Sequence, residues 1–355
     1  MKCFTGQTAD IVWQKAAAEL IARPDCAHSG RNGVTREIIP CVLQIQNPSQ
    51  RWILSRRPPY NPAFGLVEFI WIITGNNESG VLNYWNPELP KFSGAGDEYH
   101  GAYGFRLRRE FGLDQIKRAY DVLSNAPDTR QAVLQIWKPE IDMPTGEGKP
   151  VSPDIPCNVM SLLKVRDGRL HWTQIMRSND IMRGLPYNII QFTMLQEVMA
   201  GWLGCDLGEY FHLSDSLHVY ERDAKTFYIE LTKPPSVTRD ALSLSYDATH
   251  DLFHSLYEDL RQVSGGGHNE AYLRETFDRD SPKNRSRCAL VRDMMAVIGS
   301  DAARRQGYLM LAHGLVESCM DAELRLAATN WLYHKEGKND YQEHQECLHQ
   351  SPPPG

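Results

Sequence analysis

The sequence feature that could do chemistry begins at Cys157, which follows Pro156 at the start of a predicted strand. A cysteine is a useful nucleophile only as a thiolate, and a thiolate needs a nearby cation or hydrogen-bond donor. Taken alone, such a cysteine is more often a buried and inert core residue. The polar motifs that follow it in the chain favour the nucleophile instead.

Three motifs follow Cys157 in a fixed order: Arg-Ser-Asn-Asp at 177–180, Gly-Leu-Pro-Tyr-Asn at 184–188 and Asp-Ser-Leu-His-Val-Tyr at 215–220. Arg177 lies 20 residues after Cys157, and Asn188 lies 11 residues further on. Any one of these motifs would be a weak signal, whereas the ordered set is a strong one.

The ordered set resembles the thymidylate synthase family, and a looser resemblance extends from about residue 31 to about residue 220. The resemblance implies that the Cys157 thiolate adds to C6 of a uracil or cytosine ring and so makes C5 nucleophilic. It also implies that Arg177 both stabilises this thiolate and binds the nucleotide phosphate, which suits the planar fork of an arginine.

Further nucleotide contacts follow from the same resemblance. Ser178 and Arg31 resemble phosphate contacts, and Arg130 resembles the arginine that the family supplies from the partner subunit, which implies a homodimer packed sheet to sheet. His218 and Tyr220 resemble the pair that holds the sugar 3′-hydroxyl, and alternation along a strand puts both on one face. A lone arginine is more often a solvated surface charge, so these assignments depend on the whole pattern.

The resemblance also assigns an acid/base and a folate site. Glu68, in an apolar predicted helix, resembles the general acid/base, and burial would raise its pKa towards neutrality. Tyr103 resembles the tyrosine that assists removal of the C5 proton. Asp180 and Gly184 resemble residues that line the folate site, and Trp85 resembles the first tryptophan of a Trp-x-x-Trp motif. The implied cofactor is 5,10-methylenetetrahydrofolate.

Asn188 resembles the residue that reads the base. Its amide can donate one hydrogen bond and accept another, which matches the O4 and N3–H edge of uracil. Cytosine-modifying relatives commonly have an aspartate at this position, so Asn188 favours dUMP. A flipped amide could serve cytosine, so dCMP and CMP stay open, as does the choice between ribose and deoxyribose.

The sequence departs from the family pattern at four points. Gln131 follows Arg130, where a second arginine is usual, so one phosphate contact is lost. Glu88 replaces the second tryptophan of the motif that begins at Trp85, and Asn158 replaces the histidine that usually follows the nucleophile. The short closing C-terminal peptide of the family is not recognisable, and a helical extension stands in its place.

These departures favour the hydroxymethylase branch of the family. After one-carbon transfer from the folate, an exocyclic methylene forms on C5 of the nucleotide. A dry, closed site lets hydride transfer complete a methyl group, whereas a site that admits water gives a hydroxymethyl group. We therefore expect a 5-hydroxymethyl nucleotide, with reductive methylation of dUMP to dTMP as the alternative.

Other functional classes explain less of the sequence. A hydrolase that pairs Cys157 with His218 leaves the Arg-Ser-Asn-Asp and Gly-Leu-Pro-Tyr-Asn motifs unexplained. A non-catalytic nucleotide-binding relative would not need the nucleophile, Glu68 and Asn188 together. Three potential metal ligands near the end, His344, Cys347 and His349, are more typical of a disordered polar tail, so no metal is expected.

The elements that must position these residues are read from hydrophobic periodicity. Strands are predicted at 157–165 and 169–177, joined by an Asp-Gly turn at 167–168. Further strands are predicted at 37–46, 51–54, 131–137 and 209–220. Helices are predicted at 10–22, 64–74, 113–124, 189–203, 252–263, 288–298 and 302–331, and a long loop at 75–104.

These elements predict an α/β (α+β) fold, thymidylate synthase-like, with a large mixed, mainly antiparallel sheet covered by helices. The catalytic domain is predicted at 1–235, and a helical C-terminal extension packed on it at 236–355.

Composition excludes several classes. The chain has 355 residues, a net charge of −6 and no run of Lys or Arg typical of a nucleic-acid binder. No apolar stretch approaches the length of a membrane-spanning helix, and the N-terminus lacks a signal-peptide pattern. The eight cysteines form no CxxC pair, which argues against a zinc ribbon or a disulfide scaffold. We expect a cytoplasmic protein.

Overall fold

The computed structural model describes all residues except 23–26, 31–32, 232–243 and 338–355. The chain forms two compact units. Unit 1 comprises Met1–Ile53, Phe64–Ile229 and Ala241–Gly266. Unit 2 comprises Leu54–Ala63, Glu230–Asp240 and Gly267–Gly355.

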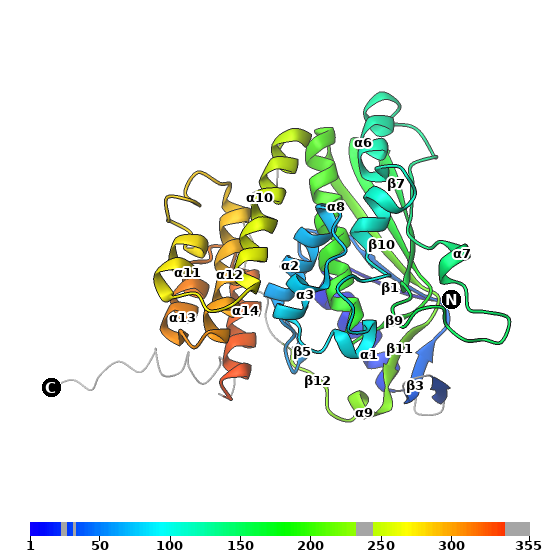
Figure 1. Ribbon diagram of the computed structural model, residues 1–355. Helices are drawn as coiled ribbons and strands as arrows, with labels where there is room; N and C mark the ends of the chain where they lie inside the picture. Colours follow the sequence, from blue (N-terminus) through cyan, green and yellow to red (C-terminus); the bar gives the residue numbers. More distant parts are fainter. Residues whose placement is uncertain (23–26, 31–32, 232–243, 338–355) are drawn as a thin grey trace, which may run out of the picture. The chain divides into compact units, whose positions relative to one another are not determined.

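A mixed sheet of six strands forms the centre of unit 1 (Figure 1). Its strands, in spatial order, are β1 (Lys2–Gly6), β4 (Cys41–Ile45), β10 (Asp206–Ser214), β8 (Arg169–Met176), β7 (Asn158–Arg166) and β6 (Val133–Gln135). Three of the five neighbouring pairs are antiparallel, and the pairs β1–β4 and β10–β8 are parallel. The predicted large mixed, mainly antiparallel sheet is confirmed.

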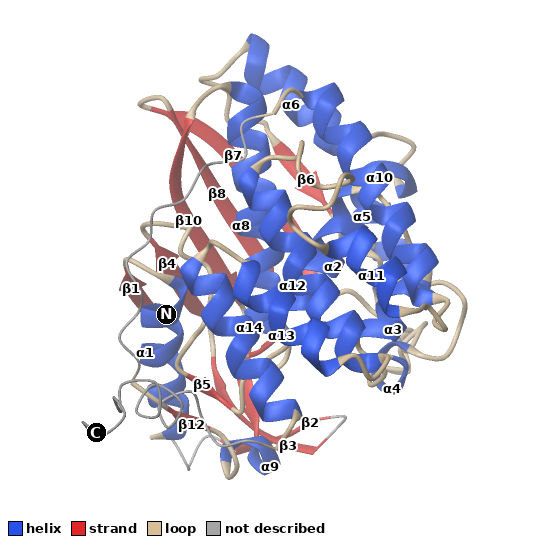
Figure 2. Ribbon diagram, turned by 90° about the vertical axis from the view of Figure 1, so that its left-hand side faces the viewer, coloured by secondary structure: helices blue, strands red, loops and turns tan. Residues whose placement is uncertain are grey.

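Helices cover this sheet because its strands bury alternate side chains. The helix α8 (Gly184–Leu203) packs on β8 and β10, α1 (Ala9–Ile21) packs on β1 and β4, and α6 (Gln115–Asn125) packs on β6 (Figure 2). The helix α8 begins before the predicted residue 189, because Pro186 fits a first turn that needs no N–H donor. It ends at Gly204, which takes the left-handed conformation at φ +63°.

A second, four-stranded sheet lies beside the motif residues. Its order is β2 (Ala27–Gly30), β3 (Gly33–Ile38), β11 (Leu217–Tyr220) and β9 (Asn179–Asp180). The predicted single strand 209–220 is therefore wrong, since its second half leaves the first sheet and pairs with β3 and β9. The predicted strand 37–46 is likewise divided between β3 and β4.

Two other predicted segments differ from the structure. The predicted strand 51–54 forms no ladder: Arg51 is fully buried against Glu197, so this short run is core without being a strand. The predicted loop 75–104 contains three short helices. They are α3 (Ser79–Trp85), α4 (Pro90–Ser93) and the start of α5 (Tyr103–Phe105), which leads into the π-helix η1 (Arg106–Glu110).

The helix α10 (Tyr246–Ser264) belongs to unit 1. It packs on α3, and its Phe253 ring meets Phe69 edge to face at 5.2 Å. Phe69 lies in α2 (Pro62–Ile73), the helix that carries Glu68. The domain boundary predicted at residue 235 stays a prediction. Unit 1 also holds α7 (Pro139–Asp142), α9 (Glu221–Ala224) and β12 (Tyr228–Ile229).

Unit 2 is mainly a group of helices. These are α11 (Glu270–Phe277), α12 (Ala289–Arg305), α13 (Leu309–Ser318) and α14 (Ala322–Lys335), and the short strand β5 (Arg56–Arg57) also belongs to this unit. The helix α12 packs on the other three. Gly299 allows the closest approach, because a Cβ there would lie 2.2 Å from Phe277 Cβ.

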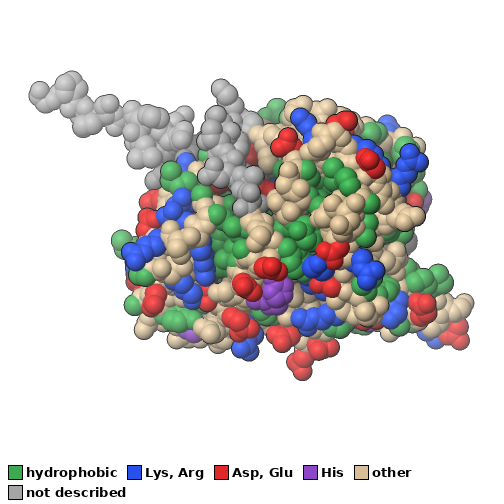
Figure 3. Space-filling view, turned by 90° about the horizontal axis from the view of Figure 1, so that it is seen from above, with side chains coloured by type: hydrophobic (Ala, Val, Ile, Leu, Met, Phe, Trp, Pro, Cys, Tyr) green, Lys and Arg blue, Asp and Glu red, His purple; other side chains and the backbone are tan. Residues whose placement is uncertain are grey.

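Charged side chains of both signs are mixed on one face of the molecule. On the face drawn in Figure 3, Lys and Arg side chains are interspersed with Asp and Glu and form no continuous basic stripe. Among the described residues, no helix combines the length and the apolar character needed to cross a membrane.

Candidate active site

Cys157 and Arg177 meet because the strands beside them form a hairpin. Cys157 directly precedes β7, and Arg177 directly follows β8. The turn residues Asp167 and Gly168 have φ of 51° and 71°, as a two-residue hairpin turn requires. The Arg177 amide donates to the Cys157 carbonyl at 2.9 Å, and Arg177 Nη2 lies 3.9 Å from Cys157 Sγ. The hairpin thus explains the sequence spacing of the two motifs.

Arg177 is held in place by its own contacts. Its Nε donates to the Pro156 carbonyl at 2.9 Å and its Nη2 to the Ile155 carbonyl at 3.1 Å. The guanidinium also lies 5.4 Å from the Trp137 ring centroid, a cation–π contact. The residue is nonetheless exposed. A fixed, accessible cation beside a sulfur can stabilise a thiolate and meet a phosphate.

Glu68 lies in α2 among apolar side chains. The residue is half-buried, but its Oε2 is inaccessible to solvent and has no hydrogen-bond partner among the described residues. Burial raises the pKa of Glu68 from 4.5 to about 8, and a hydrogen bond with the Gln191 side chain lowers it in part. A carboxyl group with this pKa is mostly protonated at neutral pH and can act as a general acid.

Gln191 connects Glu68 to Asn188. Asn188 Nδ2 donates to Gln191 Oε1 at 3.1 Å, three residues along the buried face of α8. Because Oε1 accepts this bond, the Gln191 amide nitrogen is the group left to donate to the Glu68 carboxylate. Gln191 was not predicted from the sequence, although its spacing from Asn188 on one helix could have indicated it.

Tyr103 is electrostatically linked to the same group. Burial raises the pKa of Tyr103 well above 10, and the negative charges of Cys157, Glu68 and Asp154 raise it further, while Arg177 opposes them. Its position depends on its neighbour in α5. A Cβ on Gly104 would lie 2.3 Å from the Ile72 carbonyl oxygen of α2, so only glycine allows this approach. The sequence analysis assigned no role to Gly104 or Asp154.

The predicted sugar-binding residues lie together. Ser178 Oγ is 3.5 Å from His218 Nδ1, and the His218 and Tyr220 rings meet edge to face at 5.5 Å. Parallel pairing of β11 with β9 sets His218 directly opposite Asp180. The strand alternation that predicted a shared face for His218 and Tyr220 is therefore consistent with their contact.

The predicted folate residues border this group. Asp180 Oδ1 accepts from the amides of Met182 and Arg183 at 2.8 and 3.0 Å. Its Oδ2 is buried and accepts no hydrogen bond among the described residues, with Arg183 Nε 3.8 Å away. Burial raises the pKa of Asp180, while the His218 charge and the two amides oppose the rise. The backbone at Gly184 lies close to Asn179, since a Cβ there would lie 3.1 Å from Asn179 Oδ1.

Three predicted residues are not joined to this group in the described chain. Trp85 ends α3 and is 1% exposed, so its indole is part of the core and contacts Tyr84. Arg130 is exposed in the loop before β6. Arg31 lies outside the described residues. The roles of Trp85 and Arg130 stay predictions.

Asn158 directly follows the nucleophile in the chain and is the first residue of β7. It is fully buried, and its Oδ1 accepts a hydrogen bond from Gln174 Nε2. Gln174 Oε1 in turn accepts from Ser161 and Trp172. Asn158 Nδ2 has no hydrogen-bond partner among the described residues, so it is a buried donor that a water molecule could satisfy.

Comparison with known proteins agrees with this geometry. The thymidylate synthase family model matches residues 59–271 of the chain. The chain belongs to the thymidylate synthase family.

Relatives of this family member include phage proteins. It is 33% identical over 234 residues to a deoxyuridylate hydroxymethyltransferase of Bacillus phage SP01, covering 63% of this chain and 60% of the relative. It is 33% identical over 184 residues to the deoxyuridylate hydroxymethyltransferase of Pseudomonas phage M6, covering 51% of each. A putative thymidylate synthase of Methanothermobacter marburgensis is 31% identical, with 60% of this chain and 90% of the relative aligned. The chain thus spans 51–60% of the length of these two phage relatives.

Members of the thymidylate synthase family use 5,10-methylenetetrahydrofolate. Asp180 Oδ2 accepts no hydrogen bond among the described residues, so it offers a carboxylate acceptor for N–H groups of a pterin ring. This acceptor fits the cofactor.

A buried histidine that the sequence analysis missed supports the Arg-Ser-Asn-Asp motif. Asn179 Nδ2 lies 2.6 Å from His212 Nε2, and Tyr210 Oη lies 2.9 Å from His212 Nδ1. Burial lowers the pKa of His212 to about 3, so its ring is neutral and can accept from Asn179. The network fixes Asn179 next to Gly184.

No group of three or more His, Cys, Asp or Glu side chains in the described part of the chain could hold a metal ion. His344, Cys347 and His349 lie outside the described residues.

Proposed function

We propose that this protein transfers a one-carbon unit from 5,10-methylenetetrahydrofolate to C5 of dUMP and releases 5-hydroxymethyl-dUMP. The observation that carries the proposal is the pairing of Cys157 Sγ with the anchored Arg177 guanidinium at 3.9 Å. The Glu68–Gln191–Asn188 chain supplies the acid and the base-reading amide of the same reaction.

Cys157 begins the reaction as a covalent nucleophile. Its thiolate forms the S–C6 bond, and the electron pair of the C5–C6 double bond moves towards C4 and O4. Glu68, protonated at neutral pH because its pKa is about 8, donates a proton towards O4 as that charge develops. The Arg177 guanidinium holds the 5′-phosphate, with Ser178 beside it.

Asn188 accounts for the choice of uracil. Gln191 Oε1 engages one N–H of the Asn188 amide. The second N–H remains to donate to O4, and Oδ1 remains to accept from N3–H. His218 and Tyr220 hold the sugar hydroxyl.

The folate supplies the one-carbon unit when bound. Asp180 orients it through Oδ2, which accepts no hydrogen bond among the described residues. Tyr103 lies near both Cys157 and Glu68, where it can assist removal of the C5 proton. As this proton is lost, the bond between the transferred carbon and the folate breaks and tetrahydrofolate is released, which leaves a methylene on C5. After water has added to this methylene, elimination of the Cys157 thiolate from C6 restores the C5–C6 double bond.

Access of water decides between a hydroxymethyl and a methyl product. Glu88 stands where the family usually has a second tryptophan, and its side chain is 63% exposed. Asn158 follows the nucleophile in the chain, and its Nδ2 is a buried donor able to hold a water molecule. Addition of water to the methylene on C5 gives the hydroxymethyl group without any change in the oxidation state of the folate. The names of the two phage relatives support this product, and dTMP synthesis is the second candidate.

One experiment tests the reaction, the base and the sugar together. The protein is incubated with 5,10-methylenetetrahydrofolate and dUMP, dCMP, UMP or CMP. The masses of the nucleotide products are then measured by mass spectrometry. We expect a gain of about 30 Da on dUMP with tetrahydrofolate released. A gain of about 14 Da with dihydrofolate formed would instead establish a synthase. The Cys157→Ala variant is the control, and its turnover would contradict the covalent mechanism.

A further inference from the structure

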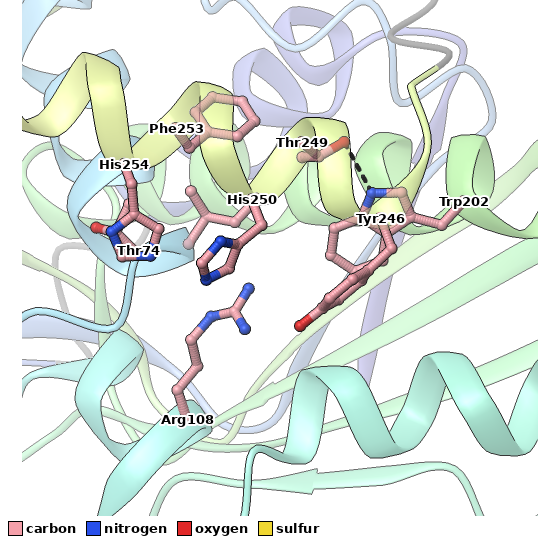
Figure 4. A pocket seen from close by; sticks show the side chains of 9 residues that line it. Thr74, Arg108, Trp202, Tyr246, Thr249, His250, Phe253 and His254 are labelled. Carbon is pink, nitrogen blue, oxygen red and sulfur yellow. Dashed lines mark hydrogen bonds between the residues drawn. The ribbon is translucent and has the colours of Figure 1, made fainter.

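A hollow outside the candidate active site lies in unit 1. It has an empty volume of about 210 Å³ and is formed where α10 passes the end of α2 and the π-helix η1 (Figure 4). None of the residues predicted to bind nucleotide or folate lines it. The hollow is therefore not part of the predicted nucleotide and folate sites.

Arg108 is built into the wall of the hollow. Its side chain is 9% exposed, and its Nη1 donates to Asp114 Oδ2 at 2.7 Å. Its Nε is buried and has no hydrogen-bond partner among the residues that the structure describes. Gly75, at φ +73°, makes room for the stem, since a Cβ there would lie 2.9 Å from Arg108 Cδ. A buried guanidinium N–H without an acceptor indicates a missing ligand or water.

Two histidines and a tyrosine of α10 also line the hollow. His250 and His254 lie one turn apart with their ring centroids at 4.3 Å, and Tyr246 lies one turn before them. Figure 4 shows the Arg108 guanidinium pointing towards the His250 ring, with the Tyr246 hydroxyl beside them. Thr249, also in the wall, donates to the Ser245 carbonyl and accepts from Trp202.

Charged groups of both signs lie around the hollow. Burial lowers the pKa of His254, and the positive charges of His250, Arg108 and Arg109 lower it further, while Asp251 opposes them. Asp251 is 89% exposed, so solvent screens its charge. Asp114 is engaged by Arg108 itself. The feature that favours an anion is therefore the buried Arg108 Nε–H, which has no acceptor among the described residues.

We propose that this hollow binds a small oxyanion, a phosphate or a phosphoryl group, between Arg108 Nε, the His250 ring and the Tyr246 hydroxyl. An N–H of a guanidinium, an imidazole and a hydroxyl together offer three donors to one tetrahedral anion. The site is separate from the predicted substrate phosphate site at Arg177 and Ser178.

Inorganic phosphate is the first probe. Its binding is followed by NMR, through the imidazole C–H resonance of His254, because this measurement does not depend on turnover. Spectra of the His254→Gln variant assign the resonance. We expect it to shift and saturate with phosphate at constant pH, in the wild type and equally in Arg177→Gln. Arg108→Gln and the half-exposed His250→Gln should each weaken this binding at least about tenfold.

Arg109→Gln is the matched control. Arg109 neighbours Arg108 on the same π-helix but is exposed and does not line the hollow, so its loss should change affinity by about twofold or less. The proposal is overturned if no saturable shift occurs, or if the shift survives in Arg108→Gln and disappears in Arg177→Gln. A second titration with dUMP in Arg177→Gln separates the sources of the anion: a shift with both probes supports a nucleotide phosphoryl group, and a shift with phosphate alone supports free phosphate.

Discussion

At the scale of single residues, the buried carboxyl of Glu68 makes activity depend on pH. Because its pKa is raised to about 8, the proton that it donates is present below this pH and lost above it. We expect kcat to fall as pH rises through about 8, and Glu68→Gln to lower kcat about 10²–10⁴-fold at neutral pH. Steady-state kinetics from pH 6 to 10 would measure both, and a pH-independent kcat across this range would contradict the assignment.

Gln191 should determine the pH at which kcat falls, the alkaline limb of the pH profile. The hydrogen bond from Gln191 lowers the pKa of Glu68, so Gln191→Leu should move the limb of kcat to higher pH. The control is Gln196→Leu, because Gln196 is also buried on α8 but donates to the carbonyls of Leu170 and Gly208. This control should reduce stability without moving the limb. An equal pH profile in wild type and Gln191→Leu would show that Gln191 does not act on Glu68.

Asn188 should control the base. Asn188→Asp replaces the N–H that faces O4 with an acceptor, which suits the N4 amine of cytosine. We expect the ratio of kcat/KM for dUMP to that for dCMP to fall at least about tenfold, since a mismatched polar group in a closed site is costly. Competition between the two nucleotides gives this ratio directly. A ratio that stays at its wild-type value would refute base reading by this amide.

At the scale of elements, the contact between α5 and α2 places Tyr103 near Glu68. Gly104→Ala would set a Cβ 2.3 Å from the Ile72 carbonyl oxygen, and backbone cannot move aside as a side chain can. We expect a loss of about 1–3 kcal/mol in the free energy of unfolding, together with a lower kcat. Gly80→Ala is the matched control, because no heavy atom lies within 4 Å of a Cβ there and alanine favours the α3 helix. Urea unfolding of both variants tests the contact, and equal stabilities would contradict it.

The sequence predicted those elements that have one clear period. The hairpin around Asp167 and Gly168 and the helix around Glu68 are examples, and the hairpin explains why Cys157 and Arg177 share a site. The transfer of the chain from β10 to β11 was not predictable, because alternation continues across it. Only long-range backbone bonds mark the transfer, such as the 2.7 Å bond from the Asn179 amide to the Ser216 carbonyl.

The candidate site likewise contains residues that could be predicted from the sequence and residues that could not. Residues inside ordered motifs, such as Ser178 and Asn188, could be named from the sequence because motif order carries the information. Gly104 and His212 could not, since each matters through a contact with a residue at least 32 positions away, Ile72 for Gly104 and Asn179 for His212. Such contacts leave no periodic signal in the chain.

At the scale of the whole molecule, the exposed Arg130 could act on the phosphate site of its own subunit or on that of a second subunit. It lies in the loop before β6 and is not joined to Arg177 within the described chain. We propose, from the family resemblance, that it reaches the phosphate site of a second subunit. Arg130→Ala should then raise KM for dUMP more than it lowers kcat, since a lost phosphate contact weakens binding of the ground state and the transition state alike.

Co-expression of two defective chains tests this arrangement. A Cys157→Ala chain has no nucleophile but offers Arg130, whereas an Arg130→Ala chain has the nucleophile and lacks the arginine. In a symmetric dimer, a mixed pair would contain one intact site, so random pairing should restore about a quarter of wild-type activity at low dUMP concentration. If Arg130 served its own subunit, no mixed pair would contain an intact site, and activity would stay at the level of the Arg130→Ala chains alone. Sedimentation of the mixture shows whether pairs form, so that failure to associate is distinguished from service within one subunit.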